Sequence, residues 1–383
     1  MKDLPDLSPD PVILQRENFQ QLLDVIIAKK YKIAGPKIKD GAVILDEILK
    51  TEDLPIGWSD SQESATYRLI ERGDRALFRY ALGPQSWKKF LYPPVQKLYE
   101  AHRTQNGWKI SSTKEPKLKF AFLGVRPCEI EAINALDRVF REGEYSDPGY
   151  RKRRQNTLII AVNCGVAGGT CFCASMDTGP KAKSGFDLAL TEVLENEEHY
   201  FVVEVGTKLG AEIVKEIEHT RAGQEQLDKA QSISAAASDQ MGRELDTSDL
   251  HVLLSRSSEH PQWKDIASRC LTCGNCTMVC PTCFCSTVED YTDLQGKEAV
   301  RVRRWDSCFT MDYSYIHGGS VRYSAEARYR QWLTHKFANW LEQFGTFGCV
   351  GCGRCITWCP AAIDITEEIK AIGKNQTFEK KTA

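Results

Sequence analysis

The sequence predicts two domains, an α/β domain over residues 1–255 and an all-α helical domain over residues 256–383. Two observations predict this division. In the first 200 residues, short apolar runs of strand length alternate with stretches of helical periodicity. Beyond Pro261 the cysteines cluster, and helix-forming segments separate them. A polar stretch from Lys208 to about Ser257 joins the two regions, and its composition is typical of a polar helix followed by a connector.

The elements of the first domain follow from periodicity and turn residues. Residues 18–30 have the pattern of an amphipathic helix. Residues 31–45 have the pattern of a hairpin, with turn residues at Lys39-Asp40-Gly41. Further along the chain we expect a buried strand at 119–125, a helix at 129–140, and strands at 157–162 and 200–205. This alternation of strands and helices predicts an α/β architecture.

The second domain contains one long helical pattern. Apolar and aromatic residues recur on one side of residues 325–344, which is typical of a helix that packs over a core. The segment between the two cysteine clusters is too long for the short connection of a compact βαβ ferredoxin. We therefore expect an all-α domain rather than a small β-containing one.

Charge and composition narrow the possible partners. A formal net charge of −2 gives no reason to expect nucleic acid or an acidic membrane surface as a partner. Residues 1–10 lack the apolar run of a secretory signal, and the longest apolar stretches are too short to span a bilayer. We expect a soluble, cytoplasmic protein without membrane contact. In that compartment, fifteen cysteines indicate metal binding rather than a disulfide framework.

Two cysteine motifs carry the strongest signal. They are Cys270-Leu-Thr-Cys273-Gly-Asn-Cys276-Thr-Met-Val-Cys280-Pro281 and Cys349-Val-Gly-Cys352-Gly-Arg-Cys355-Ile-Thr-Trp-Cys359-Pro360. Both follow Cys-x2-Cys-x2-Cys-x3-Cys-Pro, the spacing that holds two [4Fe–4S] clusters with the fourth cysteine of each motif on the other cluster. The sequence thus assigns Cys270, Cys273, Cys276 and Cys359 to one cluster, and Cys349, Cys352, Cys355 and Cys280 to the other.

Structural zinc is the alternative for these motifs, because zinc also takes four thiolates. Zinc sites use cysteines in pairs, however, and do not account for the third evenly spaced cysteine or for the Cys-Pro ending that occurs twice. The spacing therefore favours iron–sulfur clusters.

Four further cysteines lie in the first domain. Cys128 and Cys164 follow predicted strands, and Cys171 and Cys173 end a glycine-rich loop. Strand ends of an α/β sheet meet at one edge, so all four can converge on one site. We expect a third [4Fe–4S] cluster there, with zinc or buried inert thiols as alternatives.

Cys283, Cys285 and Cys308 are left over. Three cysteines do not complete a four-thiolate site, so we interpret them as packing residues beside the cluster ligands. A redox-active or substrate-facing thiol is the alternative interpretation.

No complete active site of an enzyme is evident in the sequence. The chain lacks a Gly-x-Gly-x-x-Gly after a strand, a P-loop and a Gly-x-Ser-x-Gly elbow, and its seven histidines have no metal-ligand spacing. We assign no catalytic residue. Nicotinamide, flavin or nickel chemistry would then belong to partner chains, with this chain conducting electrons between them.

Several residue strings resemble one family when taken together. They are Gly124-Val-Arg-Pro-Cys-Glu129, Asn163-Cys164, Gly169-Thr-Cys-Phe-Cys173, Cys280-Pro-Thr-Cys-Phe-Cys285, Trp305-Asp-Ser-Cys308, His335-Lys-Phe337 and the second cysteine motif. In this combination the chain resembles the β subunit of cytosolic sulfhydrogenases, and it is also similar to the A subunit of anaerobic sulfite reductases.

The resemblance implies a place in an anaerobic redox complex. A sulfhydrogenase β subunit would sit beside a flavin- and NAD(P)-binding subunit and exchange electrons with the small and large subunits of a nickel–iron hydrogenase. Delivery of electrons to a sulfite reductase or a related reductase is the second possibility, and a zinc scaffold without redox activity is the third.

Overall fold

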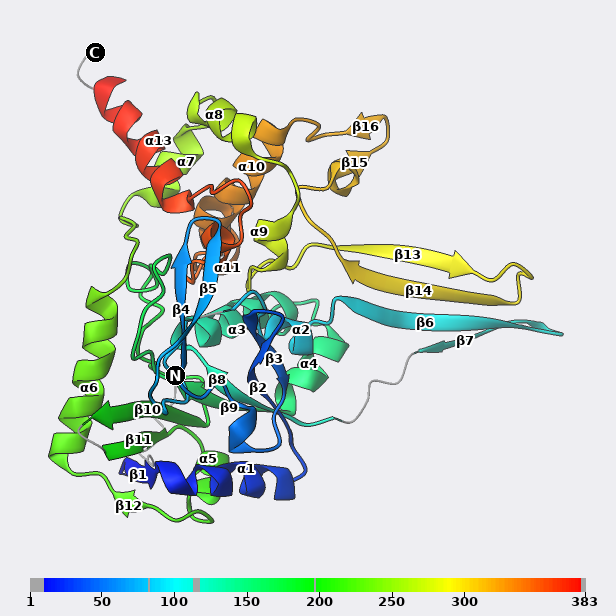
Figure 1. Ribbon diagram of the computed structural model, residues 1–383. Helices are drawn as coiled ribbons and strands as arrows, with labels where there is room; N and C mark the ends of the chain where they lie inside the picture. Colours follow the sequence, from blue (N-terminus) through cyan, green and yellow to red (C-terminus); the bar gives the residue numbers. More distant parts are fainter. Residues whose placement is uncertain (1–9, 82, 113–117, 196–197, 380–383) are drawn as a thin grey trace.

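The computed structural model describes residues 10–379 apart from residues 82, 113–117 and 196–197. The predicted absence of a secretory signal falls almost wholly on residues 1–9, which lie outside the described residues. The N-terminal region is built on an eight-stranded mixed sheet (Figure 1). Its strands in spatial order are β12 (Thr220–Arg221), β1 (Val12–Gln15), β11 (Glu198–Val205), β10 (Leu188–Glu195), β9 (Thr157–Val162), β8 (Phe120–Val125), β2 (Lys32–Lys39) and β3 (Ala42–Glu47).

The four central strands, β10, β9, β8 and β2, are parallel, whereas the outer pairs are antiparallel. In β9, Leu158 and Ile160 contribute to a core on one face of the sheet, and Ile159 and Ala161 contribute to a core on the other. A strand buried on both faces reads as a continuous apolar run, which is why the sequence revealed β8 and β9 so clearly.

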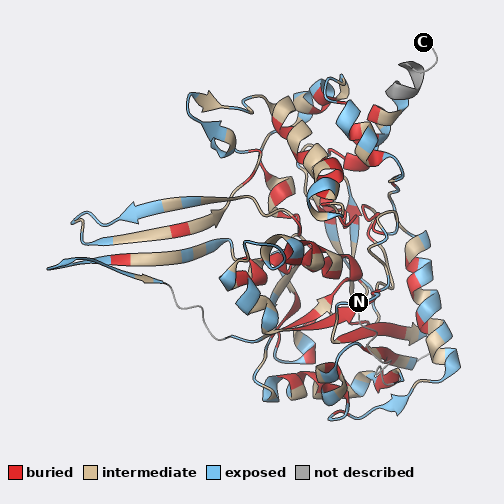
Figure 2. Ribbon diagram, turned by 180° about the vertical axis from the view of Figure 1, so that it is seen from behind, coloured by how far each residue is buried: buried red, intermediate tan, exposed pale blue. Residues whose placement is uncertain are grey.

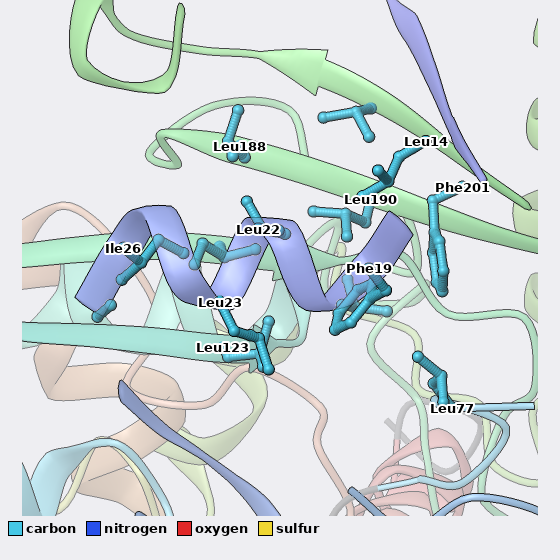
Figure 3. Close-up of a cluster of buried hydrophobic side chains, with 14 of the residues drawn as sticks. Leu14, Phe19, Leu22, Leu23, Ile26, Leu77, Leu123, Leu188, Leu190 and Phe201 are labelled. Carbon is cyan, nitrogen blue, oxygen red and sulfur yellow. The ribbon is translucent and has the colours of Figure 1, made fainter. Parts of the chain in front are cut away.

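Helices cover both faces of this sheet. On one face α1 (Phe19–Ala28) and α5 (Lys208–Val214) pack against the strands, and Figure 3 shows Phe19, Leu22 and Ile26 of α1 pointing into that core. On the other face lie α2 (Lys88–Leu91), α3 (Pro127–Phe140) and α4 (Pro148–Gln155). Helix α6 (Gln224–Asp239) packs over β1, β10 and β11.

The C-terminal region is mainly helical around a second core. Its helices are α7 (Leu250–Arg256), α8 (Gln262–Arg269), α9 (Asn275–Met278), α10 (Ala325–Thr334), a π-helical turn (His335–Asn339), α11 (Trp340–Phe344), α12 (Arg354–Thr357) and α13 (Ile365–Glu379). The predicted helix over residues 325–344 is confirmed, and its buried side chains include Trp332, Leu333 and Phe337.

The prediction of an all-α C-terminal domain is wrong. A long hairpin, β13 (Ser286–Thr292) and β14 (Glu298–Trp305), leaves the helical core, and β15 (Tyr315–Ile316) pairs with β16 (Gly319–Ser320). β14 also pairs with β6 (Val95–Thr104), which in turn pairs with β7 (Gly107–Ser112). The resulting four-stranded sheet projects as an arm whose residues are mostly exposed or half-buried (Figures 1 and 2).

The remaining predictions for the N-terminal region hold in outline. The hairpin turns at Asp40-Gly41, and the helix and strand predictions at 18–30, 129–140 and 200–205 match α1, α3 and β11. The sequence did not predict β1, β10, the arm strands β6 and β7, or the hairpin of β4 (Trp58–Glu63) and β5 (Thr66–Glu71). The polar connector contains three helices, α5, α6 and α7, rather than one.

Contacts cross the predicted boundary near residue 255. The arm joins β6 to β14, and the ring of Tyr67 in β5 stacks on Trp358 with centroids 5.1 Å apart. Among the described residues, no helix combines the length and apolar character that crossing a membrane requires.

Candidate iron–sulfur sites

The two cysteine motifs fold into similar loops. In both, the second residue after the first cysteine and the residue after the second cysteine adopt positive φ: Thr272 (51°) and Gly274 (73°) in the first loop, Gly351 (63°) and Gly353 (73°) in the second. This left-handed conformation favours glycine, which occupies three of the four positions. It also turns backbone N–H groups toward sulfur: Thr272 donates to Cys270 Sγ and Gly351 donates to Cys349 Sγ, both at 3.4 Å.

The sulfurs of the first loop lie together with the last cysteine of the second motif. Burial raises the pKa of Cys270, and the charges of Cys359 and Cys273 raise it further. Burial also raises the pKa of Cys276, with added contributions from Cys270, Cys359 and Cys273. These four cysteines, together with Cys355 of the second motif, line a void of about 30 Å³. The sequence assigned Cys270, Cys273, Cys276 and Cys359 to one cluster, and that ligand assignment stays a prediction.

The sulfurs of the second loop lie together with Cys280 of the first motif. Burial raises the pKa of Cys349 to about 12, and Cys352 and Cys280 contribute to the shift. Burial raises the pKa of Cys355 as well, where the neighbouring charges are those of Cys349, Cys352, Cys280 and, from the first set, Cys276. The two sets are therefore adjacent, with Cys276 and Cys355 between them.

A buried lysine contacts the second set. Lys336 Nζ donates to Cys280 Sγ at 3.1 Å, to Thr282 Oγ1 at 3.2 Å and to the Gly348 carbonyl at 3.0 Å. Burial lowers the pKa of Lys336, but the negative charges of Cys280, Cys283 and Cys349 outweigh burial and raise it. An ammonium group here is placed to stabilise thiolates and the anionic core that they would bind.

The four N-terminal cysteines converge where β8 and β9 end. Cys128 begins α3 just after β8, Cys164 follows β9, and Cys171 and Cys173 lie in the loop beyond. A hydrogen bond joins the side chains of Cys128 and Cys173. Burial raises the pKa of Cys164 to about 11, and the charge of Cys128 adds to the shift. Burial likewise raises the pKa of Cys171, together with Cys128 and Cys164.

This N-terminal site packs directly against the second cysteine loop. Phe172 N–H donates to the Gly351 carbonyl at 2.8 Å. A Cβ on Gly351 would lie 2.6 Å from the Phe172 carbonyl oxygen and 2.7 Å from Cys173 N, so only glycine fits at this contact. The charge of Cys352 acts on both Cys171 and Cys173. The N-terminal site and the second set are therefore neighbours.

A buried ion pair holds the two sites together. Arg354, between Cys352 and Cys355, donates through Nη2 to Glu129 Oε1 at 2.5 Å, and Glu129 is the residue after Cys128. Arg354 also donates to the carbonyls of Gly83 and Gln85, both at 2.9 Å. The two side chains are 1% and 3% exposed, so each charge depends on the other.

The side chains around these thiols fit an anionic iron–sulfur core. Arg354 Nη1 is buried and lacks a hydrogen-bond partner among the described residues, while Cys352 and Cys128 are close enough for their charges to act on it. Within the described ranges, no three His, Cys, Asp or Glu side chains come close enough to hold a single metal ion.

The three leftover cysteines also lie close together. The hydrogen bond from Cys308 and a weaker effect of the hydrogen bond from Tyr313 lower the pKa of Cys285 to about 6, although burial raises it. Cys283 hydrogen bonds to Cys280 and is near enough to Cys285 for their charges to interact. Sequence reasoning did not find the charged groups around the thiols, Lys88, Lys336 and Arg354. The sequence offered one signal for two of them: Arg354 lies inside the second cysteine motif, and Lys336 lies within the amphipathic segment 325–344.

Comparison with known proteins agrees with this geometry. The family described as "4Fe-4S dicluster domain" matches residues 269–363, which contain both cysteine loops. The chain is 35% identical to the sulfhydrogenase 2 β subunit of Pyrococcus furiosus over 310 residues, which cover 79% of this chain and 88% of that subunit. No solved structure matches the chain.

The fold and the sites define an iron–sulfur protein with a 4Fe–4S dicluster domain after a mixed α/β region. Within that class, the chain belongs to the sulfhydrogenase β-subunit family. Membership in this family supports a role in iron–sulfur electron transfer.

Proposed function

We propose that this chain relays single electrons between a flavin- and NAD(P)-binding subunit and the small and large subunits of a nickel–iron hydrogenase. The observation that carries the proposal is the proximity of the two thiol sets: Cys355 lines the same void as the first set, and the charge of Cys276 acts on Cys355. Two centres in such proximity can exchange an electron without a mobile carrier. The name of the relative in Pyrococcus furiosus, a sulfhydrogenase subunit, supports a hydrogenase complex as the setting.

The proposed ligands follow the crossed arrangement. Cys270, Cys273, Cys276 and Cys359 would hold one [4Fe–4S] cluster, and Cys349, Cys352, Cys355 and Cys280 the other. When bound, each cluster supplies reversible one-electron chemistry. The protein contributes backbone N–H groups directed at the sulfurs and the ammonium group of Lys336, both of which favour the added negative charge of reduction.

The proposal includes a third [4Fe–4S] cluster on Cys128, Cys164, Cys171 and Cys173. Its support is the convergence of four thiols at one sheet edge and their contact with the second loop through Cys352. A cluster there would extend the relay from the helical region into the α/β region. We also propose that the chain divides into two domains near residue 255, and this site lies in the N-terminal domain.

The experiment is to purify the complete complex anaerobically and to add hydrogen or NAD(P)H separately. The proposal predicts that either donor bleaches the visible absorbance of the clusters and produces the EPR signals of reduced [4Fe–4S] centres. Failure of both donors to reduce clusters that dithionite does reduce would contradict the relay. For the third cluster, Cys171→Ser is expected to lower iron by about four atoms per chain and to leave the dicluster EPR signals in place. Zinc without this iron loss would contradict it.

A further inference from the structure

A cavity of about 210 Å³ lies beside the second thiol set, and the three leftover cysteines line it. It is several times larger than the void of about 30 Å³ at the first set. Cys283, Cys285 and Cys308 are half-buried, and the cavity is also lined by Arg322, His335 and Lys336.

The base of the arm brings these three thiols together. Cys283 and Cys285 follow the first cysteine motif directly and precede β13. Cys308 follows β14, so it lies at the same open end of the β13–β14 hairpin. Ser286 pairs with Trp305 in that hairpin, and Asp306 N–H donates to the Cys285 carbonyl at 2.9 Å. A hydrogen bond between the side chains of Cys285 and Cys308 also joins the two ends of the hairpin.

Two buried ammonium groups accompany the thiols. Lys336 lines the cavity, and Lys88 Nζ donates to the carbonyls of Cys280 and Cys283, both at 2.9 Å. Lys88 and Lys336 are 3% and 4% exposed. Burying two cations is costly unless anions lie near them. A cluster at the second set would lie next to Lys336, and an anionic group in the cavity, which Lys336 also lines, would add to this compensation.

We propose that Cys283, Cys285 and Cys308 hold an additional iron–sulfur cluster, with the imidazole of His335 as the fourth donor. His335 opens the π-helical turn after α10, and its ring lies 6.4 Å from that of Phe284, the residue between Cys283 and Cys285. Turns of this kind recur at functional sites. A redox-active cysteine pair would need only two sulfurs and no cavity. Three thiols and a histidine around a cavity instead provide the four donors that a cluster requires.

The inferred cluster rests on the proposed function for its electrons. The side chains of Cys280 and Cys283 are hydrogen bonded, so the new centre would adjoin the second set. It would accept one electron from the cluster held there and return it, without bond formation. The second set would then neighbour the first set, the N-terminal site and this cavity, which makes it the branch point of the relay.

The test compares iron, sulfide and EPR of the anaerobically purified chain with those of Cys308→Ser and Cys285→Ser. Each variant is expected to lose about four irons and one EPR signal, while the dicluster signals persist. Tyr313→Phe is the matched control, because it removes the hydroxyl on Cys285 but no thiol, and it should retain full iron. His335→Cys should retain iron and lower the potential of one cluster, since histidine ligation raises cluster potentials.

Unchanged iron in both serine variants, or a Cys285–Cys308 disulfide in the wild-type chain, would overturn the inference. Alkylation of the intact protein provides a test that needs no variant. The inference expects Cys285 and Cys308 to resist alkylation until iron is chelated, and rapid labelling of the iron-loaded protein would refute it. An iron-free wild-type chain would instead refute the proposed function itself, so the two failures are distinguishable.

Discussion

Replacement of Arg354 by methionine tests whether the buried ion pair joins the two halves of the protein. The change leaves Glu129 buried at 3% exposure without its cation and removes hydrogen bonds to Gly83 and Gln85. Loss of one partner of a buried pair costs about 3–5 kcal/mol. If the 383 residues unfold as one cooperative unit, with about 2.1 cal/mol/K of unfolding entropy per residue, that corresponds to a fall of roughly 4–6 °C in the unfolding midpoint.

The assay is thermal unfolding of the anaerobic, iron-loaded protein, followed by far-UV circular dichroism and by cluster absorbance. Glu129→Gln and the double variant complete a double-mutant cycle. We expect a coupling energy of about 1–3 kcal/mol, so that the double variant is less destabilised than the sum of the single changes. A midpoint within about 2 °C of wild type for Arg354→Met, or strictly additive effects, would refute the reasoning.

Three further predictions concern ligation, potential and pH. Cys359→Ala should remove the EPR signal of the cluster assigned to the first loop, because its fourth thiolate comes from the second motif. Lys336→Met should lower the potential of the cluster at Cys280 by on the order of 100 mV in a redox titration, since it removes a positive charge 3.1 Å from Cys280 Sγ. Burial raises the pKa of Tyr67 to about 12. Its neutral phenol therefore stabilises the fold fully below about pH 10 and loses this contribution, about 3 kcal/mol at most, as pH rises through 12.

Each of these predictions has a contrary outcome. Loss of signal confined to the cluster of Cys349 would exclude crossed ligation. An unchanged or higher potential in Lys336→Met would mean that the ammonium does not act on that cluster. For Tyr67, the control is Tyr67→Phe, whose unfolding free energy should fall less between pH 10 and 12, and parallel pH curves for the two proteins would contradict the assignment.

The sequence was sufficient to predict those parts of the structure that depend on residues close together in the chain. The cysteine spacings predicted two similar loops, and both motifs fold into loops with left-handed residues at the same positions. The assignment of the fourth cysteine of each motif to the other cluster stays a prediction. Strands β8 and β9 were evident because burial on both faces leaves a continuous apolar run.

The arm was missed because its strands depend on partners far away in the sequence. β14 carries Arg301, Arg303 and Arg304, and it pairs with β6 some two hundred residues earlier in the chain. Strand formation there depends on cross-strand neighbours rather than on the segment itself. The buried Lys336 was missed for a similar reason, since only the folded chain shows the thiolates that stabilise its charge.

EPR spectroscopy of the fully reduced, anaerobically purified protein tests the central claim most directly. Two [4Fe–4S] clusters that meet at Cys276 and Cys355 should interact magnetically and give a broadened, spin-coupled spectrum. Cys359→Ala should remove the magnetic coupling that involves the first-loop cluster, while the signals of the remaining centres persist. A colourless protein that contains zinc and no iron after reconstitution, or two clusters without magnetic interaction, would contradict the account.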